Sequence, residues 1–506
     1  MKKFSLSARI PAMVLILVLV ASLASCSVYK GAGDMSNADM APGYFGGEFS
    51  AEEYTEIVEN GFVSTVENAT SYFSIDANTS SYPNLRSFIT NQYSIIPKDA
   101  VRIEEMLNYF NYDYKAPENG DILSLTSSFF DTPYNSETKL LTLGLAAEEV
   151  KLSDVKNNLV FLIDVSGSMS SADKLPLVQS AFMLLTESLN PEDRVSIVTY
   201  AGSDSVALSG AFGYEKNRIM NVVEDLTAGG STAGADGIET AYELAKQYFI
   251  EGGNNRVILA TDGDFNVGLS FTADLEQFIS KKRETGVYFS VYGFGRENIK
   301  SNKMEALALA GNGVFSYIDS IKEARRALVT DIGGSLVTVA KDVKAGISFN
   351  SEIIESYRLV GYENKLLTEE EFESSETDAG ELGSGHTVTV VYEVKLKEGA
   401  EIESAETLAD VTVKYKPTEN VGADAVTEKS VVLSVKPEAY HIEPTQNDLF
   451  VASVVEFGLL LRDSEYKAGA NSESLIARLE GLDFANDEFK SEFRELVKTY
   501  YANREQ

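Results

Sequence analysis

The hydrophobic pattern in the middle of the chain alternates between short apolar runs and longer stretches with apolar residues at helical spacing. The runs predict strands at Leu159–Ile163, Val195–Tyr200, Ser205–Leu208, Arg256–Ala260, Val287–Tyr292 and Val314–Ile318. The stretches predict helices at about Lys174–Leu189, Lys216–Leu226, Ala235–Phe249, Ala273–Thr285 and Met304–Ala310, with another from Lys322. Apolar strands separated by helices are typical of an α/β doubly wound (Rossmann-like) domain, whose parallel sheet is covered on both faces.

One of these strands is expected to run against its neighbours. Only Ala201-Gly202-Ser203-Asp204 separates Val195–Tyr200 from Ser205–Leu208. A parallel pair needs a crossover of roughly a dozen residues, so this short link predicts an antiparallel edge strand.

Outside this central domain, at 157–334, the pattern changes twice. Residues 51–150 are mixed, with a helix expected at Asp99–Phe110 and strands within Ile122–Val150, and they predict an N-terminal α/β domain. Residues 335–438 have apolar residues at every second position, which predicts a flanking antiparallel β-sandwich. Within that region we expect the acidic segment Glu369–Gly385 to be an exposed loop. Residues 439–506 predict a small C-terminal helical domain, with helices at Gln446–Arg462, Ser472–Leu479 and Glu488–Tyr500.

The first residues are typical of a bacterial export signal. Basic residues precede the apolar run Met13–Ala24, which is shorter than the ~20 residues that span a bilayer. The run ends in Leu23-Ala24-Ser25-Cys26, which resembles a lipobox and implies cleavage before Cys26 and acylation of its thiol. We therefore expect a signal peptide at 1–26, a flexible Gly- and Ser-rich tether at 27–50, and an extracytoplasmic protein anchored in the lipid of a bacterial cell or outer membrane. The alternative is an unlipidated secreted protein whose one cysteine is incidental.

The chain is strongly acidic, with 77 Asp and Glu against 43 Lys and Arg and a formal net charge of −34. This charge disfavours nucleic acid as a partner, because binding to phosphates requires basic side chains. It suits cations or basic partners, although the interpretation we favour is a solvated acidic surface.

Candidate chemistry lies where the predicted strands end. Asp164-Val165-Ser166-Gly167-Ser168 follows the first strand, and Asp262 follows the fourth. The glycine-rich stretch 229–234 carries Thr232 toward the same edge. In a doubly wound order 3-2-1-4-5-6 the first and fourth strands are neighbours, and ligands bind at the carboxyl ends of strands where the order reverses.

This pattern resembles the metal-ion-dependent adhesion site (MIDAS) of a von Willebrand factor type A (vWA) domain. The resemblance implies that Ser166, Ser168 and Thr232 ligate a divalent cation directly or nearly so. It implies that Asp164 and Asp262 act mostly through bound waters, and that a carboxylate of a protein partner fills the last position. Three further segments, Arg102–Phe110, Ala260–Gly268 and Thr445–Asp448, resemble bacterial vWA lipoproteins of the YfbK kind.

The residue types themselves predict the ion and exclude several other sites. Oxygen ligands suit Mg²⁺ or Mn²⁺, whereas Zn²⁺ is disfavoured because no Cys or His belongs to the set. Asp262-x-Asp264-x-Asn266 lacks the glycine and the final acid of an EF-hand loop, so we interpret Asp264 and Asn266 as turn or supporting residues. The glycine-rich stretch has no following Gly-Lys-Ser/Thr, so nucleotide binding is rejected.

Three functions remain open from the sequence. The first, which we favour, is a tethered protein that captures an acidic side chain of a protein partner through its ion. The second is a structural envelope lipoprotein whose bound ion does not exchange. The third is a metal-dependent hydrolase, which needs a base near the ion, whereas His386 and His441 lie outside the site segments. We therefore expect a protein that is not an enzyme.

Overall fold

The structure is a computed structural model that describes residues 53–92, 95–151, 155–230, 235–263, 272–296, 300–331, 337–418 and 427–504. All of these residues belong to one of the chain's two compact units, Ser50–Gln506. The expected signal peptide, the tether and Cys26 lie outside the described residues. Among the described residues, no helix combines the length and the apolar character that crossing a membrane requires.

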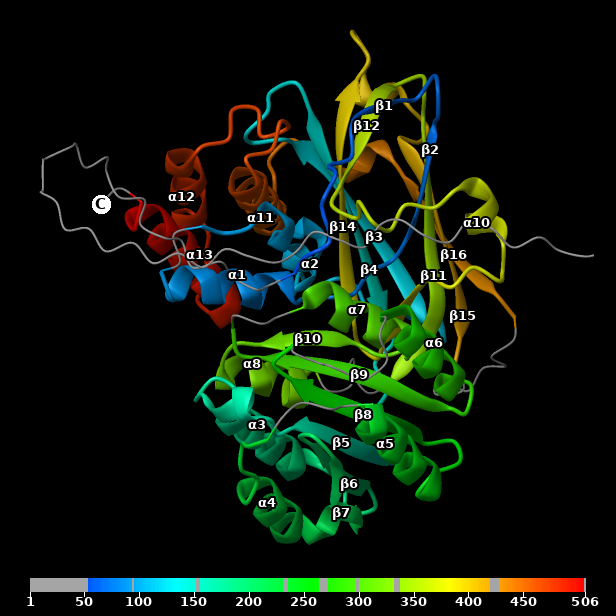
Figure 1. The fold of residues 1–506 in the computed structure, drawn as a ribbon. Coiled ribbons are helices and arrows are strands. Elements are labelled where there is room, and N and C mark those ends of the chain that lie inside the picture. The colour runs from blue at the N-terminus through cyan, green and yellow to red at the C-terminus, as the bar shows by residue number, and fades with distance from the viewer. Residues whose placement is uncertain are drawn as a thin grey trace, which may run out of the picture. The chain divides into compact units, whose positions relative to one another are not determined.

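The central domain contains the predicted six-stranded sheet, in the order β10-β9-β8-β5-β6-β7 (Figure 1). Its strands are β5 (Asn157–Asp164), β6 (Arg194–Tyr200), β7 (Asp204–Phe212), β8 (Asn254–Thr261), β9 (Val287–Phe294) and β10 (Phe315–Ile318). Every neighbouring pair is parallel except β6 and β7, which are antiparallel. The doubly wound order and the antiparallel edge strand are therefore confirmed.

Helices cover both faces of this sheet because its strands are apolar on both sides. Leu159, Phe161 and Ile163 of β5 belong to one hydrophobic core, and Val160 and Leu162 belong to another on the opposite face. The first core includes α3 (Leu175–Ser188), α4 (Lys216–Glu224) and α8 (Ile321–Arg325), followed by a π-helical turn at Arg326–Thr330. The second includes α5 (Ala235–Gln247), α6 (Thr272–Arg283) and α7 (Ser301–Ala310).

The described residues also form two antiparallel sheets that share one core, as expected of a β-sandwich. One sheet contains β1 (Val63–Ser64), β12 (Ile354–Val360), β14 (Thr387–Leu396), β4 (Lys139–Ala147) and β3 (Leu123–Asp131), with β17 (Tyr440–His441) parallel to β3 at its edge. The other contains β13 (Gly380–Gly383), β11 (Thr338–Phe349), β15 (Ala409–Pro417) and β16 (Lys429–Val435), and β2 (Thr70–Ser74) also pairs with β11. Stacked Phe349 and Tyr357 rings, 4.2 Å apart, join the two sheets.

The stretches 51–150 and 335–438, which look like separate regions in the sequence, share these sheets. Strand β2 pairs with β11, and β4 pairs with β14, across more than two hundred residues of sequence. The central domain is thus inserted between two segments of chain that fold together.

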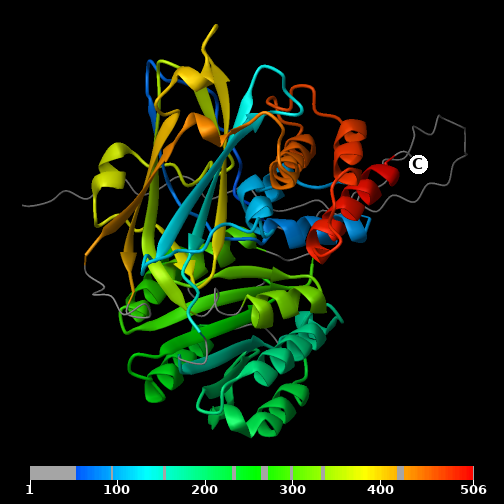
Figure 2. The ribbon, with the colours of Figure 1, turned by 180° about the vertical axis from the view of Figure 1, so that it is seen from behind.

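Helices from both ends of the described chain form a further core (Figure 1, Figure 2). They are α1 (Ser81–Thr90), α2 (Ile103–Asn108), α11 (Gln446–Arg462), α12 (Ser472–Glu480) and α13 (Glu488–Ala502). Phe110, Phe450 and Phe493 meet edge to face at its centre, with ring centroids 4.9 to 5.5 Å apart. The three C-terminal helices are confirmed, and α2 is shorter than the helix expected at Asp99–Phe110.

The prediction that Glu369–Gly385 forms an exposed loop is wrong in part. The segment contains a short helix, α10 (Glu369–Glu373), and strand β13. Helix α10 begins with a capping box, in which Thr368 and Glu371 each accept the other's backbone N–H through a side-chain oxygen. Leu382 of β13 is fully buried in the sandwich core. Strand β13 forms because it pairs with β11, and the acidic composition of the segment does not indicate this pairing.

Candidate metal centre at the carboxyl edge of the central sheet

The two predicted acidic residues of the site lie at the ends of neighbouring parallel strands. Asp164 is the last residue of β5, and Asp262 directly follows β8. The strands are in register, with Ile163 opposite Ala260, so the two acids leave the sheet at the same edge. Both side chains are fully buried. The topology thus brings together two carboxylates that are 98 positions apart in the sequence.

The turn after β5 aims oxygen atoms toward this edge. The backbone N–H of Ser166 donates to Oδ1 of Asp164 over 2.8 Å, which bends the chain back over the strand end. The hydroxyl oxygens of Ser166 and Ser168 lie 3.0 Å apart. Ser166 is buried and Ser168 is exposed, so the group of oxygens opens outward through Ser168.

The glycine-rich stretch is bonded to the same turn. Gly229 donates its N–H to the carbonyl of Val165 over 2.8 Å, and Gly167 donates to the carbonyl of Gly230 over 3.1 Å. Gly230 has a φ of +88°, a conformation that favours glycine. Thr232, two residues further on, lies outside the described residues, as do Asp264 and Asn266.

Burial disfavours the charged forms of the carboxyl groups in this site. Burial raises the pKa of the Asp164 carboxyl, hydrogen bonds from Ser166 oppose this shift, and the charge of Asp262 adds to it. Oδ2 of Asp164 also accepts a long hydrogen bond, 3.4 Å, from the Thr261 hydroxyl. Two buried carboxylates at one sheet edge favour a nearby positive charge. Carboxylate and hydroxyl oxygens are the ligands that Mg²⁺ and Mn²⁺ prefer, so the described residues fit such an ion.

Lys174, which no sequence motif marks, contributes a positive charge at this edge of the sheet. Nζ of Lys174 lies 2.8 Å from Oδ2 of Asp262, and the Lys174 side chain is only 10% exposed. Lys174 stands directly before α3, where a lysine is ordinarily interpreted as a solvated surface residue. Only its proximity to the Asp262 carboxylate in the folded chain reveals its position in the site.

A second acidic cluster lies elsewhere and includes its own cations. Carboxylate oxygens of Asp76, Glu105 and Glu305 lie within 4.8 Å of one another. Nζ of Lys365 is 3.1 Å from Asp76 and 3.3 Å from Glu305, and Nε of Arg102 is 3.7 Å from Glu105. These basic side chains neutralise much of the charge of the cluster, as Lys174 does for Asp262, so our preference for the sheet edge rests on its paired serine hydroxyls.

The arrangement around His441 does not form a hydrolytic relay. Oγ of Ser128 and Oδ2 of Asp448 both contact the same ring nitrogen, Nδ1, at 3.1 and 2.8 Å. A relay needs the serine and the acid on opposite ring nitrogens. Asp448 also accepts the N–H of Thr445 at the start of α11, so this group caps a helix.

The strand order and the Asp-x-Ser-x-Ser turn at its reversal define a von Willebrand factor type A domain. A family model with that description, "von Willebrand factor type A domain", matches residues 158–329. Two further models, described as "von Willebrand factor" and "Uncharacterized protein YfbK, C-terminal", match residues 48–142 and 334–502.

The chain belongs to the YfbK family. The protein described as "Uncharacterized protein YfbK" of Escherichia coli K12 is 36% identical over 437 residues, which cover 82% of this chain and 74% of that relative. Inter-alpha-trypsin inhibitor heavy chain H3 of Mesocricetus auratus is 26% identical over 184 residues, or 34% of this chain and 20% of that protein. The magnesium-chelatase 60 kDa subunit of Rhodobacter capsulatus is 31% identical over 121 residues, or 23% of this chain and 21% of that protein.

Among solved structures, a von Willebrand factor type A protein from Catenulispora acidiphila is similar at 16% identity. The match covers 69% of this chain and 80% of that one, with a TM-score of 0.39. Because this TM-score is below 0.5, the fold assignment rests on the family model and on the strand order.

Proposed function

We propose that this protein is an extracytoplasmic lipoprotein, tethered by acylated Cys26, that binds a protein partner through a divalent cation on its vWA domain. The observation that carries the proposal is the pair of buried carboxylates, Asp164 and Asp262, at the ends of neighbouring parallel strands. The hydroxyls of Ser166 and Ser168 lie beside them on one turn. This donor set suits Mg²⁺ or Mn²⁺.

In this proposal the protein's residues hold the ion loosely and leave one side open. The hydroxyls of Ser166, Ser168 and Thr232 would ligate it, and Asp164 and Asp262 would act mostly through bound waters. Neutral hydroxyls contribute no charge, so the ion retains attraction for an acidic side chain of the partner. The exposure of Ser168 supports this, because a partner must approach from the solvent side.

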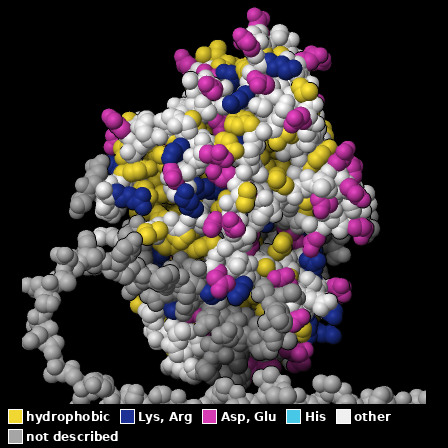
Figure 3. Space-filling view, turned by 45° about the horizontal axis from the view of Figure 1, so that its top comes forward, with side chains coloured by type: hydrophobic (Ala, Val, Ile, Leu, Met, Phe, Trp, Pro, Cys, Tyr) yellow, Lys and Arg dark blue, Asp and Glu magenta, His cyan; other side chains and the backbone are white. Residues whose placement is uncertain are grey.

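The face of the protein shown in Figure 3 gives no second clue to the partner. Asp and Glu side chains are spread over the face shown in Figure 3 rather than gathered in one patch. A dispersed negative charge is consistent with a solvated surface, so the partner's class is inferred from the ion site alone. Nucleic acid and nucleotide are not expected partners.

Calorimetric titration of Mg²⁺ and Mn²⁺ into EDTA-treated protein spanning residues 27–506 tests the proposal. We expect saturable binding by the wild type and none by Asp164→Ala. Asp76→Asn, in the second acidic cluster, is the matched control and should bind as the wild type does. Binding that survives Asp164→Ala but disappears in Asp76→Asn would move the metal centre to that cluster. Absence of binding in every protein would overturn the proposal.

The structural alternative and the hydrolase alternative require a further test. Once binding of the ion is established, addition of a carboxylate ligand, with acetate as the simplest probe, should tighten it if the ion has an open position. Tight metal binding that acetate leaves unchanged would favour a structural ion. Turnover of a chromogenic phosphate or carboxylate ester that depends on Mg²⁺ and on Asp164 would favour the hydrolase.

A further inference from the structure

The ammonium of Lys174 is part of the charge balance of the candidate site. It contacts Asp262 at 2.8 Å, and the two side chains are 10% and 0% exposed. With Asp164, the described residues of the site include two carboxylates and one ammonium, which together carry a single net negative charge. The sequence pattern of a MIDAS does not include this lysine.

Contacts with Ser171, Val178 and Gly295 hold Lys174 in this position. Its backbone N–H donates to Ser171 over 3.1 Å, and its carbonyl accepts the N–H of Val178 over 2.9 Å in the first turn of α3. Its aliphatic stem lies against Gly295, just after β9, where an added Cβ would stand 2.4 Å from Lys174 Cγ. Tyr317 fixes that glycine by donating to its carbonyl over 3.0 Å. The lysine is thus packed against the site, unlike a mobile surface side chain.

We infer that Lys174 is a built-in counter-cation that weakens binding of the divalent ion until a carboxylate ligand completes the charge balance. A divalent ion added to the site with Lys174 leaves one net positive charge, which an incoming carboxylate neutralises. Without the ammonium, the two described aspartates would balance the charge of the ion, and the carboxylate would be less strongly required. Lys174 therefore makes retention of the ion depend on the ligand. This inference rests on the proposed function, because it concerns the same ion site.

A simple structural role for Lys174 makes a different prediction. If the lysine only stabilised the buried Asp262, its removal would destabilise the protein and would either weaken metal binding or leave it unchanged. A charge-setting role requires the opposite change in affinity. The direction of the change in metal affinity therefore separates the two roles.

The experiment compares Mg²⁺ affinity, measured by calorimetry, among four proteins: wild type, Lys174→Gln, Lys174→Arg and Lys365→Gln. Lys174→Gln keeps a donor near Asp262 without its charge, and we expect its affinity to rise at least about tenfold, the effect of a nearby ammonium on a divalent ion even at the dielectric of water. Lys174→Arg keeps the charge and should bind within about threefold of the wild type. Lys365→Gln removes a lysine, 15% exposed, from the second acidic cluster and should leave the affinity unchanged.

Acetate provides the second readout. We expect acetate to raise the Mg²⁺ affinity of the wild type by a larger factor than that of Lys174→Gln, because the variant's site is already neutral with the ion bound. Lys174→Met, measured in parallel, provides a second uncharged variant if Lys174→Gln does not fold, as judged by circular dichroism.

The outcomes separate this inference from the proposed function. Binding by the wild type that depends on Asp164, with no gain in the uncharged variants, would overturn the inference and leave the proposed function standing. Binding by Lys174→Gln but not by the wild type would show that the ammonium of Lys174 excludes the ion. This result would support the inference that Lys174 opposes binding of the ion, and it would overturn the proposed function. Absence of binding in both proteins would overturn both.

Discussion

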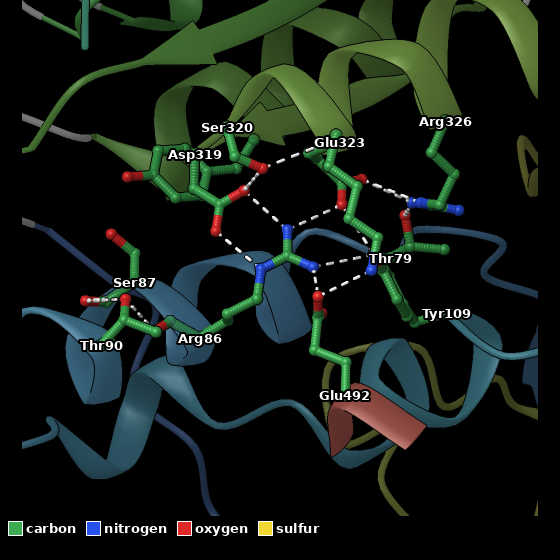
Figure 4. Close-up of polar contacts among 12 residues, drawn as sticks. Thr79, Arg86, Ser87, Thr90, Tyr109, Asp319, Ser320, Glu323, Arg326 and Glu492 are labelled. Carbon is green, nitrogen blue, oxygen red and sulfur yellow. Dashed lines mark hydrogen bonds and ion pairs between the residues drawn. The ribbon is translucent and has the colours of Figure 1, made fainter. Parts of the chain in front are cut away.

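The guanidinium of Arg86 forms a bidentate ion pair with the carboxylate of Asp319, with Nε–Oδ2 at 2.8 Å and Nη2–Oδ1 at 2.6 Å (Figure 4). Arg86 lies on α1, and Asp319 follows β10 of the vWA domain. The same guanidinium reaches Glu323 on α8 at 2.8 Å and Glu492 on α13 at 2.7 Å. One buried cation thus joins three segments that are far apart in the sequence.

Replacement of Arg86 by methionine should strongly destabilise the protein. The carboxylates of Asp319 and Glu323 would lose a counter-ion in a buried position, which typically costs about 3 to 5 kcal/mol. Denaturant unfolding followed by circular dichroism measures this loss.

The surface pair Lys115–Glu118 supplies the control for this variant. Its side chains are 67% and 62% exposed, so Lys115→Met should leave stability unchanged within error. A similar loss in both variants would mean that burial of the Arg86 pair does not matter.

Glu104 should give the protein a pH-dependent stability. Burial raises its pKa from 4.5 to about 7, and the charge of Glu363 adds to the shift. A carboxyl that binds its proton more tightly in the folded state lowers the free energy of unfolding as pH rises from about 4.5 to about 7, and the loss persists above that range. Glu104→Gln removes this loss of stability because glutamine does not ionise. We expect the variant to exceed the wild type in stability at about pH 8 by as much as a few kcal/mol.

Unfolding by denaturant at several pH values between about 5 and 8 checks this expectation. The exposed Glu352 supplies a control, since Glu352→Gln should leave the pH profile unchanged. A wild-type stability that rises across this range, with Glu104→Gln following it in parallel, would contradict the assignment.

Ser168 should matter for the ion and little for the fold. Its side chain is exposed, so Ser168→Ala should change the free energy of unfolding by less than about 0.5 kcal/mol. Loss of one ligand should weaken Mg²⁺ binding about tenfold, which corresponds to about 1.4 kcal/mol. Ser170→Ala, an exposed serine of the same turn outside the predicted set, is the matched control and should bind normally. Equal effects of the two substitutions would argue against the predicted ligand set.

Lys174→Met should lower the stability of the protein in EDTA. The substitution removes the buried counter-ion of Asp262, and we expect a loss of about 3 kcal/mol in the free energy of unfolding. Mg²⁺ should restore more stability to the variant than it adds to the wild type, because the ion then supplies the missing charge. Lys303→Met, at a position where the side chain is 46% exposed, is the control. Unchanged stability of Lys174→Met in EDTA would contradict the prediction.

Cys26→Ser should release the protein from membranes. Without the thiol, the expected acylation cannot occur, and the apolar run before Cys26 is too short to serve as a membrane span. Fractionation of bacteria that express the full chain should move the variant from the membrane fraction to the soluble fraction or the medium. Persistent membrane association would exclude the tether that we propose.

The sequence by itself determined the architecture of the vWA domain and the place of Asp164 and Asp262 at the carboxyl edge of its sheet. Apolar runs between amphipathic helices are typical of a doubly covered parallel sheet, and the order 3-2-1-4-5-6 places Asp164 and Asp262 on neighbouring strands. Both results follow from local periodicity and from the lengths of the connections, which can be seen in short stretches of the sequence. The same periodicity predicted α11, α12 and α13 close to their observed bounds.

Only the tertiary structure decided how the flanking regions combine and what surrounds the site. The pairings of β2 with β11 and of β4 with β14 join segments hundreds of residues apart, and nothing in either segment alone specifies its partner. The burial of Lys174 and of Arg86 likewise depends on distant parts of the chain. Long basic side chains are ordinarily solvated, and their burial depends on carboxylates that distant parts of the chain bring to them. Local pattern determines which element forms, whereas long-range packing decides which charges become buried together.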